Sequence, residues 1–158
     1  MSFVFSTKRI GFFLIIFSLI FTQYSCNINN NLDAEGYLFY YIDEYGYQVK
    51  QSDAVFQKSQ TIIVYLLNVG PFEADSDSLV KLNMDVEILY GKKKSVFEKE
   101  NYLGDEDFTE SKDTIPFLYA VWQASELNET GQYTFKLRVK DEVSGHKSIF
   151  KPSFTIVD

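Results

Sequence analysis

The sequence predicts a single all-β domain, an antiparallel β-sandwich of seven or eight strands that follows a cleavable N-terminal leader. Three observations lead to this fold class. Short segments rich in Val, Ile, Tyr, Phe and Thr recur about every ten to fifteen residues, between clusters of Gly, Asp, Asn and Ser. Several segments alternate apolar and polar residues, which is the period of a half-buried strand. No window of ten or more residues keeps the spacing of an amphipathic helix between suitable capping residues.

Length and composition fit one globular domain. The chain has 158 residues, of which 46% are hydrophobic. Removal of a leader that ends before Cys26 leaves about 130 residues, which bury roughly two thirds of the unfolded surface on folding. We therefore expect a leader at 1–25, a modified Cys and polar tether at 26–35, and one domain at 36–158.

The leader begins with a short positive segment, Lys8 and Arg9, and continues with an apolar run at 10–21. Twelve residues of helix span only about 18 Å, well short of the roughly 30 Å hydrocarbon layer of a bilayer. A signal peptide explains these features better than a membrane span does.

The end of the leader carries a small residue, Ser25, followed by Cys26, the only cysteine in the chain. This pair resembles the lipobox of bacterial lipoproteins, in which the Cys receives diacylglycerol and becomes the mature N-terminus; Gln23 departs from the Leu that the family prefers. The resemblance implies lipidation at Cys26, with acyl chains such as palmitate, and a bacterial envelope lipoprotein at the outer membrane or cell surface. Simple secretion and a retained leader are the alternatives.

The negative charge of the chain argues against one class of partner, nucleic acids. The formal net charge is -7, and loss of the two positive residues Lys8 and Arg9 makes it more negative still. Such a surface repels phosphate backbones. We therefore expect no nucleic-acid partner, and a membrane contact made through the N-terminal lipid.

Eight segments are predicted to be strands. They are 37–42, 47–50, 61–69, 81–90, 95–100, 114–123, 132–140 and 148–157. The segments 81–90 and 132–140 alternate regularly, so each has one wet face. The segment 61–69 is apolar on both sides, as expected of a central strand that is covered twice or lies against neighbours.

The C-terminal third contains Leu127 six residues before Tyr133, at the entry to a predicted strand. This spacing resembles the Leu-to-Tyr corner of immunoglobulin-like and fibronectin-like domains, although Glu129 stands where that family has Pro. The resemblance implies an immunoglobulin-like β-sandwich in which Leu127 packs inward and the Tyr133 hydroxyl bonds back to the main chain.

Groups for catalysis are scarce in this sequence, and we expect no enzyme activity and no cofactor. His146 is the only histidine and follows the turn residue Gly145. Acidic residues gather in two loops, where the weak candidates for a cation site are Asp75, Asp77, Asp105 and Asp107. Neither loop matches an EF-hand, so solvated acidic loops, and no metal, are the expectation.

Aromatic residues are densest in the first predicted hairpin. Tyr37, Tyr40, Tyr45 and Tyr47 are candidates for a recognition surface, because Tyr is enriched at protein interfaces. Ordinary sheet packing is the alternative for these rings. Trp122 lies in a segment, with Phe117 and Tyr119, that we expect to be buried.

These features predict a lipid-anchored binding or structural module without catalytic activity, which presents a β-sandwich to a protein or glycan partner. An accessory subunit of an envelope complex is the alternative, held close to its partner by the lipid. An enzyme with an unrecognised site is a third hypothesis from a different class.

Overall fold

The computed structural model describes residues 31–104, 108–110, 114–125 and 127–158. The described residues belong to one compact unit that begins at Asn31. They form strands and turns and no helix, which confirms the prediction of an all-β domain. Among them, accordingly, there is no helix of the length and apolar character needed to cross a bilayer.

Eleven strands are present in this part of the chain. They are β1 (Gly36–Ile42), β2 (Gln48–Lys50), β3 (Val55–Gln57), β4 (Thr61–Val69), β5 (Val80–Tyr90), β6 (Lys94–Lys99), β7 (Phe108–Glu110), β8 (Ile115–Gln123), β9 (Gly131–Asp141), β10 (Lys147–Phe150) and β11 (Ser153–Val157). All eight predicted segments are strands. The short strands β3 and β7 were missed, and the last predicted segment is divided at Pro152, which has no N–H for a sheet ladder.

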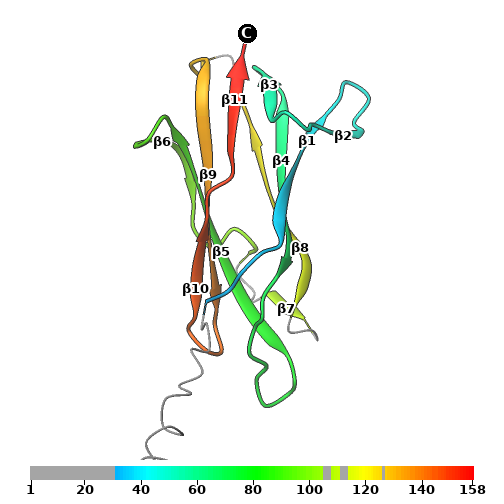
Figure 1. Cartoon of the computed structure of the whole chain (residues 1–158), viewed down its shortest axis with the longest axis vertical. Coiled ribbons are helices and arrows are strands. Elements are labelled where there is room, and N and C mark those ends of the chain that lie inside the picture. Colours follow the sequence, from blue (N-terminus) through cyan, green and yellow to red (C-terminus); the bar gives the residue numbers. More distant parts are fainter. Residues whose placement is uncertain (1–30, 105–107, 111–113, 126) are drawn as a thin grey trace, which may run out of the picture. The chain divides into compact units, whose positions relative to one another are not determined.

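The strands form two sheets that pack face to face as two layers (Figure 1). The smaller sheet has the order β2-β1-β4-β8, and all its pairs are antiparallel. The larger sheet has the order β3-β11-β9-β5-β6, with β10 also on β9 and β7 also on β5. Its one parallel pair joins β3 to β11.

The core lies between the two sheets, because alternate side chains of each strand point inward. β5 contributes Leu82, Met84, Val86 and Ile88, and all four are fully buried. The predicted alternation of β5 and β9 is therefore confirmed. Aromatic rings join the layers: Phe154 of β11 packs against Phe39 of β1, with 5.9 Å between ring centroids, and against Trp122 of β8 at the same distance.

The domain begins earlier than the predicted boundary at Gly36. Leu32 is buried in the core, and Asp33 exchanges two backbone hydrogen bonds with Gly70. Glu35 also donates a backbone hydrogen bond to Leu67. These contacts place residues 32–35 in the folded domain, so they are not part of a polar tether.

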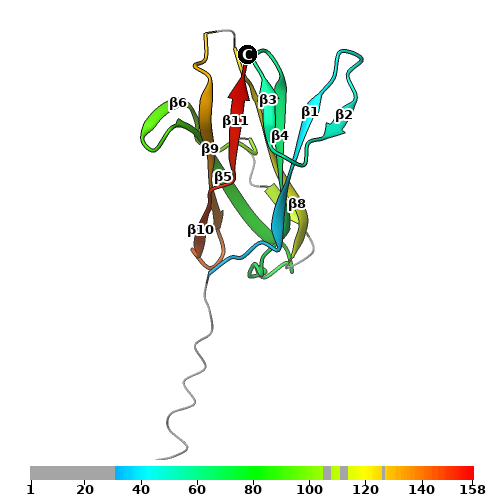
Figure 2. The ribbon, with the colours of Figure 1, turned by 45° about the horizontal axis from the view of Figure 1, so that its top comes forward.

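The described chain enters at one pole of the sandwich and ends at the other (Figures 1 and 2). At the entry pole, the Ser148 hydroxyl at the start of β10 donates a hydrogen bond to the Leu32 carbonyl. The β1–β2 hairpin and the C-terminus lie at the opposite pole. The first described residues therefore identify the pole that is closest to Cys26 along the chain.

Candidate functional site

The outer face of the smaller sheet is unusually apolar for a surface without a third layer among the described residues. The side chains that β1, β4 and β8 place on this side, here called the aromatic face, are Leu38, Tyr40, Ile63, Tyr65, Leu67, Phe117, Tyr119 and Val121. Ile63 is buried among them, and the edge strand β2 adds Lys50 opposite Tyr40. The strands that carry them, β1, β4 and β8, contain no Asp, Glu, Lys or Arg. Charge is absent from these three strands, although the protein has 22 acidic residues.

Ring contacts cross the aromatic face from strand to strand. The Tyr65 ring lies 5.4 Å from Tyr40, 5.9 Å from Phe117 and 5.5 Å from Tyr119, measured between centroids. The Tyr65 hydroxyl donates to Oε1 of Gln48 at 2.9 Å. Because such aromatic pairs add about 0.5 to 1.5 kcal/mol each, these rings hold one another in a fixed arrangement.

A shallow hollow of about 340 Å³ lies over β1 and β4, between Gln48 of β2 and Phe117 of β8. It is lined by Leu38, Tyr40, Gln48, Tyr65, Leu67 and Phe117. Gly36 lies beyond Leu38 on the same side of β1, and a Cβ added there would meet nothing within 4 Å. The face thus has a low side over β1.

The other side of the aromatic face, over β8, is raised. Phe117 is 56% exposed and Tyr119 is 49% exposed. The expectation that this whole segment is buried was wrong, because β8 has one face toward the core and one toward solvent. Trp122 and Leu118, on the inward face, are buried as expected.

The four tyrosines predicted as a recognition surface do not lie together. Tyr40 belongs to the aromatic face, whereas Tyr37 lies on the other side of β1, where its ring meets Phe39 edge-on. Tyr45 and Tyr47 lie in the β1–β2 turn, and Tyr45 is 76% exposed. The Asp43 carboxylate accepts the backbone N–H groups of both turn tyrosines.

Sequence reasoning missed Tyr65, Phe117 and Tyr119 as members of the surface. The signal was available in the spacing. In the segment 61–69, apolar residues occupy both faces of the strand. In the next segment, the aromatic residues Phe117 and Tyr119 lie two positions apart and therefore share one face. Two uncharged neighbouring strands, each with a second apolar set, indicate an apolar outer face once their pairing is known.

The predicted tyrosine corner is present, but its leucine is not part of it. The Tyr133 hydroxyl donates to the Glu129 carbonyl at 2.7 Å, and the ring is buried against Trp122. Burial raises the pKa of Tyr133, so its hydroxyl remains a donor at neutral pH. Leu127 is 95% exposed, so the expectation that it packs inward was wrong. The ring of Tyr90, 5.0 Å away, packs against Tyr133 instead.

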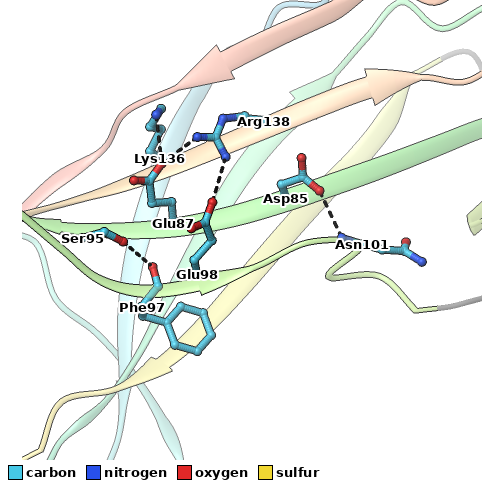
Figure 3. A network of polar contacts seen from close by, with 8 residues as sticks. All are labelled: Asp85, Glu87, Ser95, Phe97, Glu98, Asn101, Lys136 and Arg138. Carbon is cyan, nitrogen blue, oxygen red and sulfur yellow. Dashed lines mark hydrogen bonds and ion pairs between the residues drawn. The ribbon is translucent and has the colours of Figure 1, made fainter.

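The outer face of the larger sheet is polar (Figure 3). The Glu87 carboxylate lies 2.9 Å from the Lys136 ammonium and 2.6 Å from the Arg138 guanidinium, which also approaches Glu98. These partners, Lys136 first, lower the pKa of Glu87 against the opposing effect of burial. Asp85 accepts the backbone N–H of Asn101. The charges of this face pair with one another, which contrasts with the uncharged aromatic face.

Asp141, at the end of β9, is the one charged side chain that is fully buried among the described residues. Its carboxylate accepts from the Glu73 and Val143 backbone N–H groups at 2.8 and 2.9 Å, and from the Ser144 hydroxyl at 2.7 Å. Burial alone raises the pKa of Asp141, but these hydrogen bonds outweigh it and lower the pKa. The residue joins the β4–β5 connection to the β9–β10 turn.

The acidic candidates for a metal site do not form one in the part of the chain that is described. The Asp75 carboxylate accepts hydrogen bonds from the backbone N–H groups of Asp77 and Leu79 and forms an ion pair with Lys81. The described residues contain no group of three or more His, Cys, Asp or Glu side chains placed to hold a metal. Asp105 and Asp107 lie outside the described residues. His146 lies in the β9–β10 turn, as predicted.

No protein-family model matches this chain, and no curated protein matches it. Interlocked rings, a shallow hollow and an absence of charge suit binding by shape and apolar contact.

Proposed function

We propose that this protein is a lipid-anchored binding module of the bacterial cell envelope, without catalytic activity, whose immunoglobulin-like sandwich contacts a protein partner through the aromatic face. The observation that carries the proposal is the uncharged, partly exposed apolar surface over β1, β4 and β8. Contiguous exposed apolar patches on soluble domains mark interaction sites.

The immunoglobulin-like assignment is supported by two features. Two antiparallel-rich sheets enclose one core, and Tyr133 bonds back across four residues at the entry to β9. This bond is the corner typical of such sandwiches. The buried Trp122 ring lies between the sheets and packs on Tyr133 and Phe154, which is a further point of agreement.

The anchor is supported by the leader and by the lone Cys26 at its end. A thioether also accounts for an unpaired cysteine in an exported protein. Membrane attachment would raise the effective concentration of any partner held in the same layer, so a modest face suffices for binding.

The anchor is tested by metabolic labelling in a lipoprotein-producing bacterium. We expect the full chain to take up radiolabelled palmitate and to partition into the detergent phase. Cys26→Ala should lose the label, whereas Ser25→Ala, which keeps a small residue before the cysteine, should retain it. An unlabelled parent protein with a free N-terminus other than Cys26 would reject the lipoprotein assignment.

A further inference from the structure

We propose that the partner of the aromatic face is a second copy of this chain, anchored in the same membrane and related to the first by a two-fold axis that runs along β4. The inference rests on the proposed function and names the occupant of that surface. It follows from the shape of the face, from its charge and from the length of the N-terminal tether.

The shape of the face is complementary to itself. In the sheet register, Gly36, Leu67 and Phe117 form one row across β1, β4 and β8, and Leu38, Tyr65 and Tyr119 form the next row of side chains. The raised residues stand at the β8 end of each row. The open space over Gly36 lies at the β1 end, and the hollow extends from β1 across β4 as far as Phe117.

A two-fold axis along β4, between two facing copies, places β8 of one copy over β1 of the other at the same level. Phe117 of each copy then lies over Gly36 of its neighbour, and Tyr119 lies over Leu38. The central strand meets its own counterpart, so that Leu67 approaches the same residue of the second copy. The two raised side chains, Phe117 and Tyr119, therefore each face a smaller residue, as a self-complementary isologous interface requires.

The tether selects this axis over its alternative. Leu32, which is buried, lies six positions after Cys26, and a chain of this length spans at most about 21 Å when fully extended. An axis across the strands would place the two entry poles at opposite ends of the pair, at least the roughly 30 Å length of a nine-residue strand apart. An axis along β4 keeps both entry poles on one side, where both lipids reach one membrane.

The charge distribution also favours this face over the other sheet. Each copy is strongly acidic, so contact between charged faces is opposed. β1, β4 and β8 contribute no carboxylate to the interface. The outer face of the larger sheet already pairs its charges within one copy, Glu87 with Lys136 and Arg138, so contact there would remove those ion pairs from water.

The test uses the purified full chain, processed and reconstituted in neutral lipid vesicles, with single added cysteines. Facing sheets pack about 10 Å apart, so a bismaleimide of that span should join Leu67→Cys to its counterpart near the axis. Ile149→Cys, an exposed apolar position on β10 of the opposite face, is the matched control. We expect dimers from Leu67→Cys, in at least about tenfold greater yield than from Ile149→Cys.

A second variant, Gly36→Phe, fills the open space over Gly36. Gly36→Phe adds a ring where a Cβ meets nothing, so the fold and melting midpoint should remain while Phe117 of the neighbour is excluded. In the Leu67→Cys background it should abolish the dimer. Mixing Gly36→Lys copies with Phe117→Glu copies should restore a dimer that neither forms alone.

The parent chain, without an added cysteine, is the control that tests the lipid anchor independently of the dimer. Its only cysteine, Cys26, is blocked when lipidated, so crosslinking of the parent, or its loss from vesicles, rejects the anchor. With the anchor intact, three outcomes would overturn the paired arrangement. They are no dimer from Leu67→Cys, equal yields from Leu67→Cys and Ile149→Cys, and a yield that Gly36→Phe leaves unchanged.

Discussion

Asp141→Ala is expected to lower the free energy of unfolding by roughly 3 to 5 kcal/mol, because a buried carboxylate with several donors disappears at once. The Glu73 and Val143 N–H groups and the Ser144 hydroxyl all lose their acceptor. Hydrogen bonds to a charged group contribute about 1.5 to 3 kcal/mol each, although they are not additive. Urea unfolding monitored by circular dichroism measures the change.

The matched control is Asp43→Ala. Asp43 also accepts two backbone N–H groups, from Tyr45 and Tyr47, but it does so in an exposed turn where water replaces the lost acceptor. We expect a cost of about 1 kcal/mol or less there. Equal costs at positions 141 and 43 would contradict the importance of burial at Asp141.

The same residue makes stability depend on pH in one direction. The folded-state pKa of Asp141 is lowered relative to the ordinary value of about 3.9, so its stabilisation is fully present above that value. It is lost as the pH falls through the folded-state pKa. Asp141→Asn should therefore be less stable than the parent at pH 7, with a smaller difference below about pH 3.9. A difference that grows on acidification would contradict this sign.

Phe154→Ala is expected to destabilise the domain by about 3 to 5 kcal/mol, through lost transfer energy and the cavity that remains. Its ring lies 5.2 Å from Phe135, 5.6 Å from Tyr133 and 6.0 Å from Phe56, in addition to its contacts with the smaller sheet. It therefore supports both layers of the core. The loss is measured in the same urea experiments.

Val157→Ala on the same strand is the control for Phe154. Its side chain is partly exposed near the C-terminus, and we expect a change within about 0.5 to 1 kcal/mol. A small effect of Phe154→Ala, no larger than that of Val157→Ala, would show that the two sheets are not joined through this ring.

The sequence predicted those strands whose alternation is regular. β5 and β9 each alternate five buried residues with polar or charged ones, and a shift of one residue would bury those polar side chains. β3 and β7 have three residues each, too few to show a period. They are strands because they pair with a neighbouring strand. β3, for example, pairs with β11, which lies about a hundred residues later in the chain.

The candidate site was predicted only in part, for a related reason. Tyr40 was identified from the density of rings in the first hairpin, but Tyr65 and Phe117 join it only through the pairing of β1, β4 and β8. A period of two identifies two faces of a strand without saying which is covered. Leu127 shows the converse, because a familiar spacing does not ensure that a loop residue turns inward.

The central claim is that the aromatic face is the contact surface of the anchored protein. Its most direct test is photo-crosslinking in the native cells, with a photoreactive phenylalanine analogue at Tyr119, and at Ile149 for comparison. The account predicts a discrete adduct from position 119, at twice the mass of the mature chain, and none from position 149. A discrete adduct of another mass would show that the aromatic face is a contact surface, but that its partner is a different molecule. No adduct from position 119, or the same adducts from both positions, would contradict the claim.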